Sequence, residues 1–269
     1  MLNSHVDRLL VQSPPRTRVK EQTRLLSPGP RQTRLSMSTI TRNEKSSMVT
    51  FQTSDGPAHG YLALPEAKAH GVMVLHAWWG LNDFFKGICD RLANEGYVAF
   101  APDLNKGTVL STVEDATEFQ KKRDEAREVQ PVITGAFDYF QRHPSLASPR
   151  IGVIGFSMGA WWAMNLANQK PDAIRAVVTF YGAGEVDPAK VQAAFLGHFA
   201  KDDEWEPLDN ILRLEASLKQ AGKNVTFHVY PKAKHWFIEE NRPKDYEAES
   251  AKLAWKRTLD FLRTQLSQA

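Results

Sequence analysis

The segment that most constrains the fold of this chain is Gly155-Phe-Ser-Met-Gly159, which follows the apolar run Ile151–Phe156 and leads into a helix-like stretch, Met158–Gln169. A strand that turns directly into a helix leaves no room for side chains on either side of the turn, so glycine is expected at both positions. Ser157 then lies at the tip of the turn with its hydroxyl exposed above a sheet. The pattern predicts a strand–turn–helix unit that presents Ser157 as a nucleophile.

Short apolar runs alternate with helical patterns from residue 48 onward. Two alternating segments, Met48–Thr53 and His59–Leu64, predict a hairpin at a sheet edge. Six continuous runs are typical of strands covered on both faces: 71–75, 97–101, 151–156, 175–180, 193–199 and 225–230. Helical patterns are found at about 82–96, 158–169, 208–221 and 245–265, and a charged segment, 113–129, leads into another helix that ends near 141. This order predicts one α/β domain, residues 48–269, with a mostly parallel sheet and helices on both faces.

The basic charge of the chain is concentrated in residues 1–47. This segment has nine Lys or Arg against three Asp or Glu, a net charge of +6, whereas the remainder has 25 against 28, a net charge of −3. A nucleic-acid-binding fold would place its basic residues on the globular surface, so no such partner is expected. The tail lacks apolar periodicity and is expected to be disordered. A later start at Met37 or Met48, or an organellar targeting segment, are the alternatives.

Composition argues against a membrane protein and against disulfides. No apolar run approaches the roughly 20 residues of a membrane-spanning helix. Cys89 is the only cysteine, which excludes an internal disulfide and a cysteine-based metal site and favours a reducing, cytoplasmic location. Because Cys89 falls within a helical pattern, a buried structural thiol is expected.

Serine is a poor nucleophile at neutral pH and needs a base and an orienting acid. Hydrolases built on such a sheet provide them in the order Ser, acid, His, from loops after later strands. His235 follows the last predicted strand and is the candidate base for Ser157, while Asp202, Asp203 and Glu204 follow the strand before it. Periodicity does not choose among these three acids.

A serine nucleophile also needs backbone N–H groups that stabilise the negative charge developing on the substrate oxygen. The N–H of Met158, at the start of the helix, is one candidate, because a helix N-terminus favours negative charge. The loop that follows the first continuous strand, residues 76–80, supplies the second, for which we choose the Trp78 N–H.

Five segments of the sequence resemble the dienelactone hydrolase family, in the right order and spacing over about residues 48–267: Val-Leu-His-Ala-Trp-Trp-Gly-Leu-Asn (74–82), Tyr-Val-Ala-Phe-Ala-Pro-Asp-Leu (97–104), Gly-Phe-Ser-Met-Gly (155–159), Asp-Glu-Trp-Glu-Pro (203–207) and Lys-His-Trp-Phe (234–237). The resemblance implies an eight-stranded α/β-hydrolase fold without a large lid domain. It also selects Asp203, by its position before Pro207, as the acid of the triad.

The chain departs from the family pattern at two linked positions. Members typically carry Cys where this chain has Ser157, and dienelactone hydrolases proper carry a Glu that activates that Cys where this chain has Ala77. The arginines that bind the dienelactone carboxylate are also missing from the expected places: Lys106 is the cation near the second segment, and Glu239, after the histidine, has the wrong sign. These departures argue against dienelactone itself as the substrate.

Tryptophans gather around the candidate catalytic residues. An aromatic pocket would suit an apolar or aryl ester or lactone. Trp162 is assigned to the core, Trp161 packing there too is the alternative, and the following residues are assigned to the pocket: Trp79, Trp161, Trp205, Trp236 and the cation Lys106. We therefore expect a serine hydrolase acting on a small ester or lactone as a monomer or homodimer, without a metal or organic cofactor. The alternatives are a thioesterase or peptidase with the same triad, and a non-catalytic fold that binds an apolar ligand.

Overall fold

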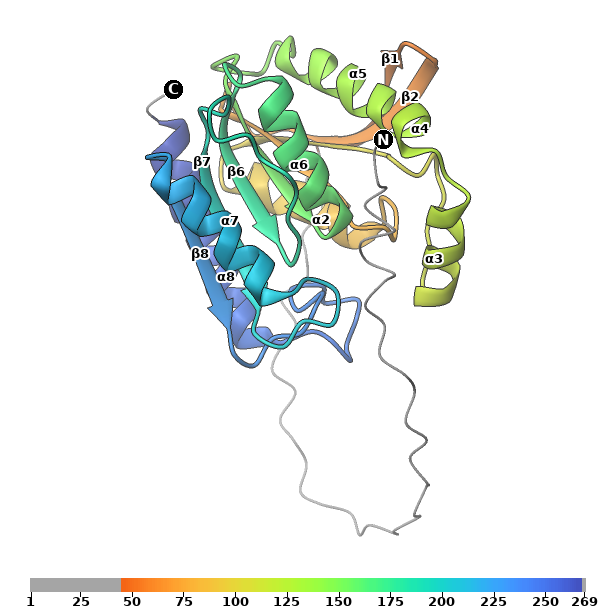
Figure 1. Cartoon of the computed structure of the whole chain (residues 1–269). Helices are drawn as coiled ribbons and strands as arrows, with labels where there is room; N and C mark the ends of the chain where they lie inside the picture. Colours follow the sequence, from red (N-terminus) through yellow and green to blue (C-terminus); the bar gives the residue numbers. More distant parts are fainter. Residues whose placement is uncertain (1–44, 268–269) are drawn as a thin grey trace, which may run out of the picture.

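The computed structural model describes residues 45–267, so residues 1–44 of the predicted basic tail lie outside it. Eight strands form one sheet in the order β1-β2-β4-β3-β5-β6-β7-β8 (Figure 1). Their bounds are β1 Ser46–Thr53, β2 Gly56–Ala63, β3 Gly71–Leu75, β4 Val98–Pro102, β5 Ile151–Phe156, β6 Ile174–Phe180, β7 Ala194–Ala200 and β8 Val225–Tyr230. The predicted eight-stranded α/β fold is confirmed.

The sheet is antiparallel only at one edge. β1 pairs antiparallel with β2, and β2 pairs antiparallel with β4, whereas all the other pairs are parallel. The predicted edge hairpin is therefore confirmed, although β1 begins two residues earlier and β2 three residues earlier than predicted. The five-residue strands β3 and β4 and the six-residue strand β5 are buried throughout, as continuous apolar runs predict.

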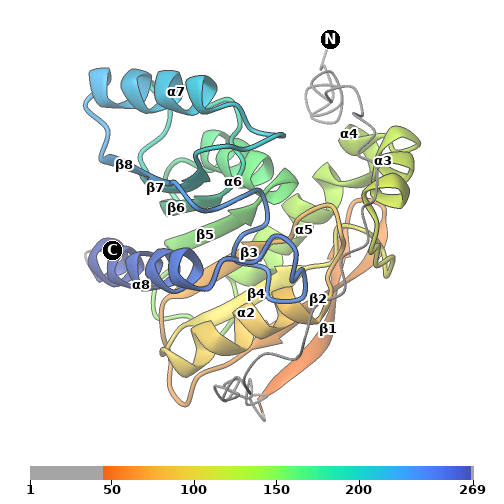
Figure 2. The ribbon, with the colours of Figure 1, turned by 90° about the horizontal axis from the view of Figure 1, so that it is seen from below.

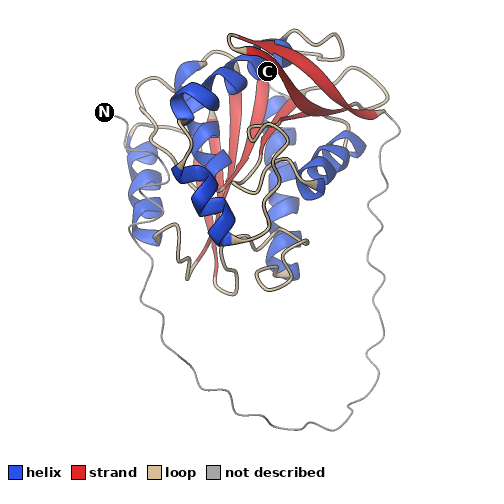
Figure 3. Cartoon of the chain, turned by 90° about the vertical axis from the view of Figure 1, so that its right-hand side faces the viewer, coloured by secondary structure: helices blue, strands red, loops and turns tan. Residues whose placement is uncertain are grey.

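Helices cover both faces of the sheet, as Figures 2 and 3 show. α2 and α8 lie on one face, and α5, α6 and α7 lie on the other. The bounds are α2 Asp83–Asn94, α3 Val113–Lys121, α4 Glu125–Glu128, α5 Gln130–Gln141, α6 Met158–Gln169, α7 Leu208–Gln220 and α8 Ala248–Leu266. The charged segment predicted at 113–129 forms two helices of its own, α3 and α4, before α5 begins. Asp124 caps the start of α4, and a proline stands in the first turn of α5. The last helix begins three residues later than predicted, capped by Glu247.

The first crossover helix shows how local sequence sets an element's limits. The Asn82 side chain accepts hydrogen bonds from the N–H groups of Phe84 and Phe85, which fixes the start of α2. Gly96 follows its end at a φ of 86°, a conformation that favours glycine. Both limits agree with the prediction, and Cys89 within this helix is buried.

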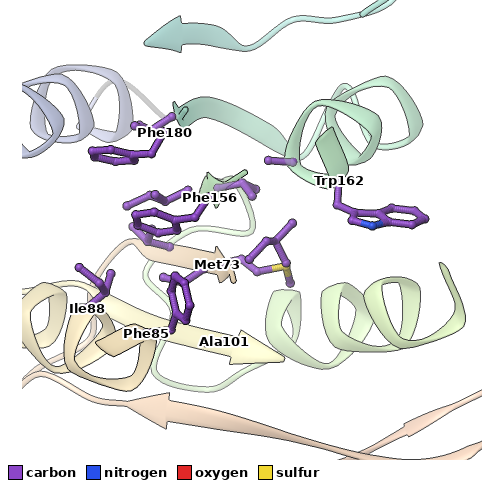
Figure 4. Close-up of a cluster of buried hydrophobic side chains, with 14 of the residues drawn as sticks. Met73, Phe85, Ile88, Ala101, Phe156, Trp162 and Phe180 are labelled. Atoms are coloured by element: carbon purple, nitrogen blue, oxygen red, sulfur yellow. The ribbon is translucent and has the colours of Figure 1, made fainter. Parts of the chain in front are cut away.

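One continuous apolar core holds the sheet and the helices together, which fits a single domain. Figure 4 shows Phe85 and Ile88 of α2 on one side of the sheet and Trp162 of α6 on the other. Phe156 at the end of β5 stacks on Phe180 at the end of β6, with ring centroids 4.9 Å apart. The strand ends that lead into the candidate site are therefore fixed by packing.

Candidate active site

The backbone at Ser157 forms the sharp turn that the sequence predicts. Ser157 follows β5 directly, caps α6, and has a φ of 50° and a ψ of −114°, a strained conformation for a residue with a side chain. A Cβ at Gly155 would collide with the carbonyl oxygen of Gly159, and one at Gly159 would collide with the carbonyl oxygen of Leu75. Both glycines are therefore required by close packing, and the second brings the loop after β3 against the start of α6.

Ser157, His235 and Asp203 form a continuous hydrogen-bonded chain. Ser157 Oγ lies 2.9 Å from His235 Nε2, and His235 Nδ1 lies 2.9 and 2.8 Å from the two carboxylate oxygens of Asp203. A carboxylate only accepts, so Nδ1–H donates to Asp203 and Nε2 is left to accept the Ser157 proton. Ser157 and His235 are each only 4% exposed, so these hydrogen bonds are shielded from water.

The loop after β7 supplies the acid. Asp203 Oδ1 accepts from the N–H groups of Trp205 and Glu206 at 2.8 and 3.0 Å, which holds the carboxylate toward His235. Asp202 and Glu204, its neighbours in the sequence, are exposed. Of the three acids that periodicity left open, the structure brings only Asp203 to the histidine.

The backbone N–H groups of Met158 and Trp78, near Ser157, have no acceptor among residues 45–267. Met158 is the first residue of α6, where N–H groups lack intrahelical partners. Trp78 lies in the loop after β3, which the contact between Gly159 and Leu75 brings to the start of α6. Both N–H groups are thus free to donate to an oxyanion.

Four tryptophans form one aromatic cluster beside the histidine. The rings of Trp78 and Trp205 lie 5.2 Å apart, and those of Trp79 and Trp236 lie 5.1 Å apart. Trp236 also contacts the ring of His235 at 4.8 Å. Trp78, Trp79 and Trp236 are buried, so much of their surface packs against one another. This cluster next to His235 agrees with the expectation that aromatic side chains surround the site.

Trp161, predicted to line the pocket, is half-buried and packs edge-on against Trp162, with ring centroids 4.7 Å apart. Trp162 is buried in the core, as expected.

Lys106, predicted to line the substrate site, makes its ion pair outside the triad. Lys106 occupies a turn at a φ of 52°, and its ammonium group lies 3.6 Å from the Glu128 carboxylate. It lines a separate pocket of about 210 Å³ with His59 and Asp103, which contains none of Ser157, His235 and Asp203. Its ammonium group is thus paired with the end of α4.

Sequence reasoning missed a buried polar group beside the triad. The Tyr181 hydroxyl donates to Glu239 Oε1 at 2.8 Å, and the Tyr181 ring contacts the His235 ring at 4.9 Å. Burial raises the pKa of Glu239 to about 8, against the lowering effects of the Tyr181 hydrogen bond and of Arg242. Fold topology brings Glu239 to Tyr181, 58 positions away in the sequence, so no local pattern signals this pair.

Arg242 is a cation beside the tryptophan cluster that no sequence pattern indicates. Its guanidinium lies 3.8 Å from the ring centroid of Trp79 and 4.7 Å from that of Trp236. Its Nε lies 3.5 Å from Asp245. Stacking on indole rings gives it a position that spacing from His235 does not reveal.

Among residues 45–267 no three His, Cys, Asp or Glu side chains gather in a way that could hold a metal ion. Within the same part of the chain, no helix is both long and apolar enough to cross a membrane.

A mostly parallel eight-stranded sheet with a serine at the turn between a central strand and its helix is the architecture of the α/β-hydrolases. Comparison with known proteins narrows this class. The sequence model of the dienelactone hydrolase family matches residues 58–266, and the chain belongs to that family of hydrolases.

Relatives match over nearly their full length. The chain is 31% identical to "Protein usf" of Aquifex pyrophilus, over 82% of this chain and 99% of that protein. It is 29% identical to the "Putative carboxymethylenebutenolidase" of Aquifex aeolicus, over 81% and 98%. A crystal structure titled "Putative Dienelactone Hydrolase", from Klebsiella pneumoniae, superposes with a TM-score of 0.69 at 25% identity and covers 81% of this chain and 99% of its own.

Proposed function

We propose that this protein is a serine hydrolase that cleaves a small ester or lactone through an acyl-enzyme. The observation that supports this proposal most strongly is the chain from Ser157 Oγ to His235 Nε2 and from His235 Nδ1 to the Asp203 carboxylate, with every step at 2.8–2.9 Å. These are the hydrogen-bond distances expected between a nucleophile, a general base and an orienting acid.

Each group has a defined part in the reaction. Ser157 Oγ attacks the carbonyl carbon while His235 Nε2 takes the hydroxyl proton, and the negative charge moves to the carbonyl oxygen. The N–H groups of Met158 and Trp78 stabilise that oxyanion. When this tetrahedral intermediate breaks down, the bond to the alcohol oxygen breaks and that oxygen takes the proton from His235. The acyl group remains on Ser157. Water, deprotonated by His235, then releases the acid and restores the serine. Asp203 holds the imidazole and stabilises its charged form.

The serine suits its surroundings better than a cysteine would. Family members typically pair Cys with an activating Glu, and this chain has Ser157 and Ala77 at the two positions. Ala77 is fully buried, so an ionised carboxylate there would bear a desolvation cost that a Ser–His–Asp triad does not require. The joint replacement supports a serine mechanism.

The aromatic cluster and the relatives' names indicate the substrate class. The Aquifex aeolicus relative is named for a butenolide, which is a lactone. Trp205 and Trp236 lie beside the His235 ring, and Trp78 packs against both. This indole surface favours an aryl or apolar acyl or alcohol group. We expect dienelactone itself to be a poor substrate, since Lys106 points elsewhere and Glu239 is buried beside Tyr181.

No cofactor is required for this chemistry. A free, buried Cys89 is consistent with a reducing compartment, and we place the enzyme in the cytoplasm. We expect a monomer or homodimer that binds a small-molecule substrate and neither nucleic acid nor membrane.

A substrate panel tests the function. Aryl esters, short acetyl esters, lactones, thioesters and peptide amides would be assayed on the wild type and on Ser157→Ala. We expect aryl esters or lactones to be hydrolysed fastest and the Ser157→Ala rate to fall by about 10⁵-fold or more. Faster cleavage of thioesters or amides would instead identify a thioesterase or peptidase, and no cleavage of any class would favour a ligand-binding role.

A further inference from the structure

His76 is a buried ionisable group to which the proposed mechanism gives no role. It directly follows β3 and has no exposed surface. Its ring makes two hydrogen bonds to the backbone: Nδ1 lies 2.6 Å from the carbonyl oxygen of Ala77, and the N–H of Leu104 donates to Nε2 at 3.0 Å. The imidazole therefore joins the loop after β3 to the loop after β4.

The hydrogen bond from Leu104 determines which ring nitrogen carries the proton. A backbone N–H can only donate, so Nε2 of His76 must be unprotonated. In the neutral ring Nδ1 then bears the proton and donates it to the Ala77 carbonyl. Burial lowers the pKa of His76 to about 4, which keeps the ring neutral near pH 7. The surroundings thus select one tautomer with one donor.

That donor acts on the peptide unit that contains the Trp78 N–H. The Ala77 carbonyl and the Trp78 N–H lie on opposite sides of one planar peptide, so fixing the direction of the carbonyl fixes that of the N–H. Gly80 N–H donates to the same oxygen at 3.2 Å. Two donors on a carbonyl polarise its peptide and strengthen the N–H as a donor.

The other end of this residue is held as well. The Trp78 carbonyl accepts from Asn105 Nδ2 at 3.0 Å, and Asn105 Oδ1 in turn accepts from Arg123 at 2.8 Å. Both peptides that flank the Trp78 Cα are therefore anchored, while the Trp78 N–H has no acceptor among the described residues.

We propose that His76 is a positioning residue that aims the Trp78 N–H at the oxyanion formed on the substrate attacked by Ser157. This role rests on the proposed serine-hydrolase function. The other donor, the Met158 N–H, is oriented by helix α6, whereas Trp78 lies in a loop. His76 gives that loop the rigidity that a helix gives Met158, and a donor oriented before the reaction stabilises the transition state without reorganisation.

Two conservative variants separate the two hydrogen bonds of His76. In His76→Asn the amide nitrogen can occupy the place of Nδ1 and keep the bond to the Ala77 carbonyl. In His76→Gln the amide oxygen can occupy the place of Nε2 and keep the bond from Leu104. The measurements are kcat and KM for an aryl ester, Ki for a trifluoromethyl ketone that forms a tetrahedral adduct with serine, and Tm.

The positioning role predicts different results for the two variants. His76→Gln should lower kcat by about 10- to 100-fold with KM within about twofold, and Ki should rise by the same factor as kcat falls. His76→Asn should keep kcat within about threefold of the wild type, because the donor to Ala77 remains. Equal losses of kcat in both variants, in step with Tm, would show a purely structural role and overturn the proposal, as would full activity in a folded His76→Gln.

A measurement on the wild type keeps the test valid if a variant does not fold. With ¹⁵N-labelled histidine, NMR should show His76 neutral at pH 7 with the proton on Nδ1; a proton on Nε2 would overturn the proposal, since Nδ1 could not then donate to Ala77. Failure of the function itself has a different signature: a wild type that the trifluoromethyl ketone does not inhibit contradicts the serine mechanism whatever the tautomer of His76.

Discussion

Chemistry at this site depends on single side chains whose partners come from distant parts of the sequence. His235 and Asp203 are 32 positions apart, and Ser157 and His235 are 78 apart. The places of Ser157 and His235 after strands predict both residues, and the family resemblance predicts Asp203. The structure brings Asp203, and not its acidic neighbours, to the histidine. The sequence does not indicate which partners the charged side chains contact. Lys106 pairs with Glu128, whereas Arg242 stacks on Trp79 and Glu239 accepts a hydrogen bond from Tyr181.

The choice of acid leads to a matched pair of variants. Asp203→Asn should lower kcat by about 10³- to 10⁴-fold, because an amide in place of the carboxylate no longer stabilises the Nδ1–H tautomer and the charged imidazole. Asp202→Asn, at an exposed neighbour, should stay within about twofold. Steady-state kinetics on an aryl ester measure both. Equal losses in the two variants would contradict the assignment.

Glu239 should make the stability of the protein depend on pH. Its folded pKa, about 8, lies above the ordinary value of 4.5, so its contribution to stability is full below pH 4.5 and is lost as the pH rises toward 8. Glu239→Gln cannot ionise and avoids that loss. The variant's advantage in the free energy of unfolding should grow by about 3 kcal/mol between pH 5 and pH 8.

Urea unfolding of the wild type and of Glu239→Gln at the two pH values measures this difference. Glu240→Gln, at the exposed neighbouring carboxylate, serves as the control and should parallel the wild type. An advantage of Glu239→Gln that does not change with pH would show that Glu239 is ionised throughout.

At the scale of elements, hydrophobic pattern and caps predicted most of the structure. All eight strands are found within three residues of their predicted limits, because continuous apolar runs and turn residues are local signals. The helices of the region 113–141 are predicted less well, since the cap at Asp124 lies within a charged segment that periodicity alone treats as continuous. The strain at Ser157 was foreseeable only through its flanking glycines.

The elbow depends on the contact between α6 and the loop after β3. Gly159→Ala should destabilise the protein by about 3 kcal/mol or more, since the new Cβ would meet the backbone carbonyl of Leu75, which cannot move aside. Gly152→Ala, in β5, comes closest to the flexible end of Leu262, at 3.1 Å, and should cost less than about 1.5 kcal/mol. Chemical denaturation compares the two, and a smaller effect at Gly159 would contradict the packing described here.

For the whole molecule, buried histidines oppose Glu239 in the response to acid. Burial lowers the pKa of His76 to about 4 and that of His198 well below its ordinary value. His198 bridges Tyr230 and Thr258 through its two ring nitrogens, at 2.9 and 3.0 Å. A histidine whose folded pKa is lowered gives stability that is present above pH 6.5 and lost as the pH falls.

In Glu239→Gln the stabilisation that comes from protonating Glu239 is absent, while the effect of the buried histidines remains. The free energy of unfolding of that variant should fall between pH 7 and pH 5, by about 2 kcal/mol from His76 alone, whereas the wild type should change less, because protonation of Glu239 offsets part of the loss. Urea midpoints at the two pH values provide the comparison. A variant equally stable at both would show that the histidines accept protons without disrupting the fold.

The central claim is that Ser157 is a nucleophile activated by His235 and Asp203. Covalent labelling with a fluorophosphonate, followed by mass spectrometry of the intact protein and of its peptides, tests it most directly. We predict one adduct per chain, on Ser157, and none in Ser157→Ala. An unlabelled wild type, or a label that persists in Ser157→Ala, would contradict the claim.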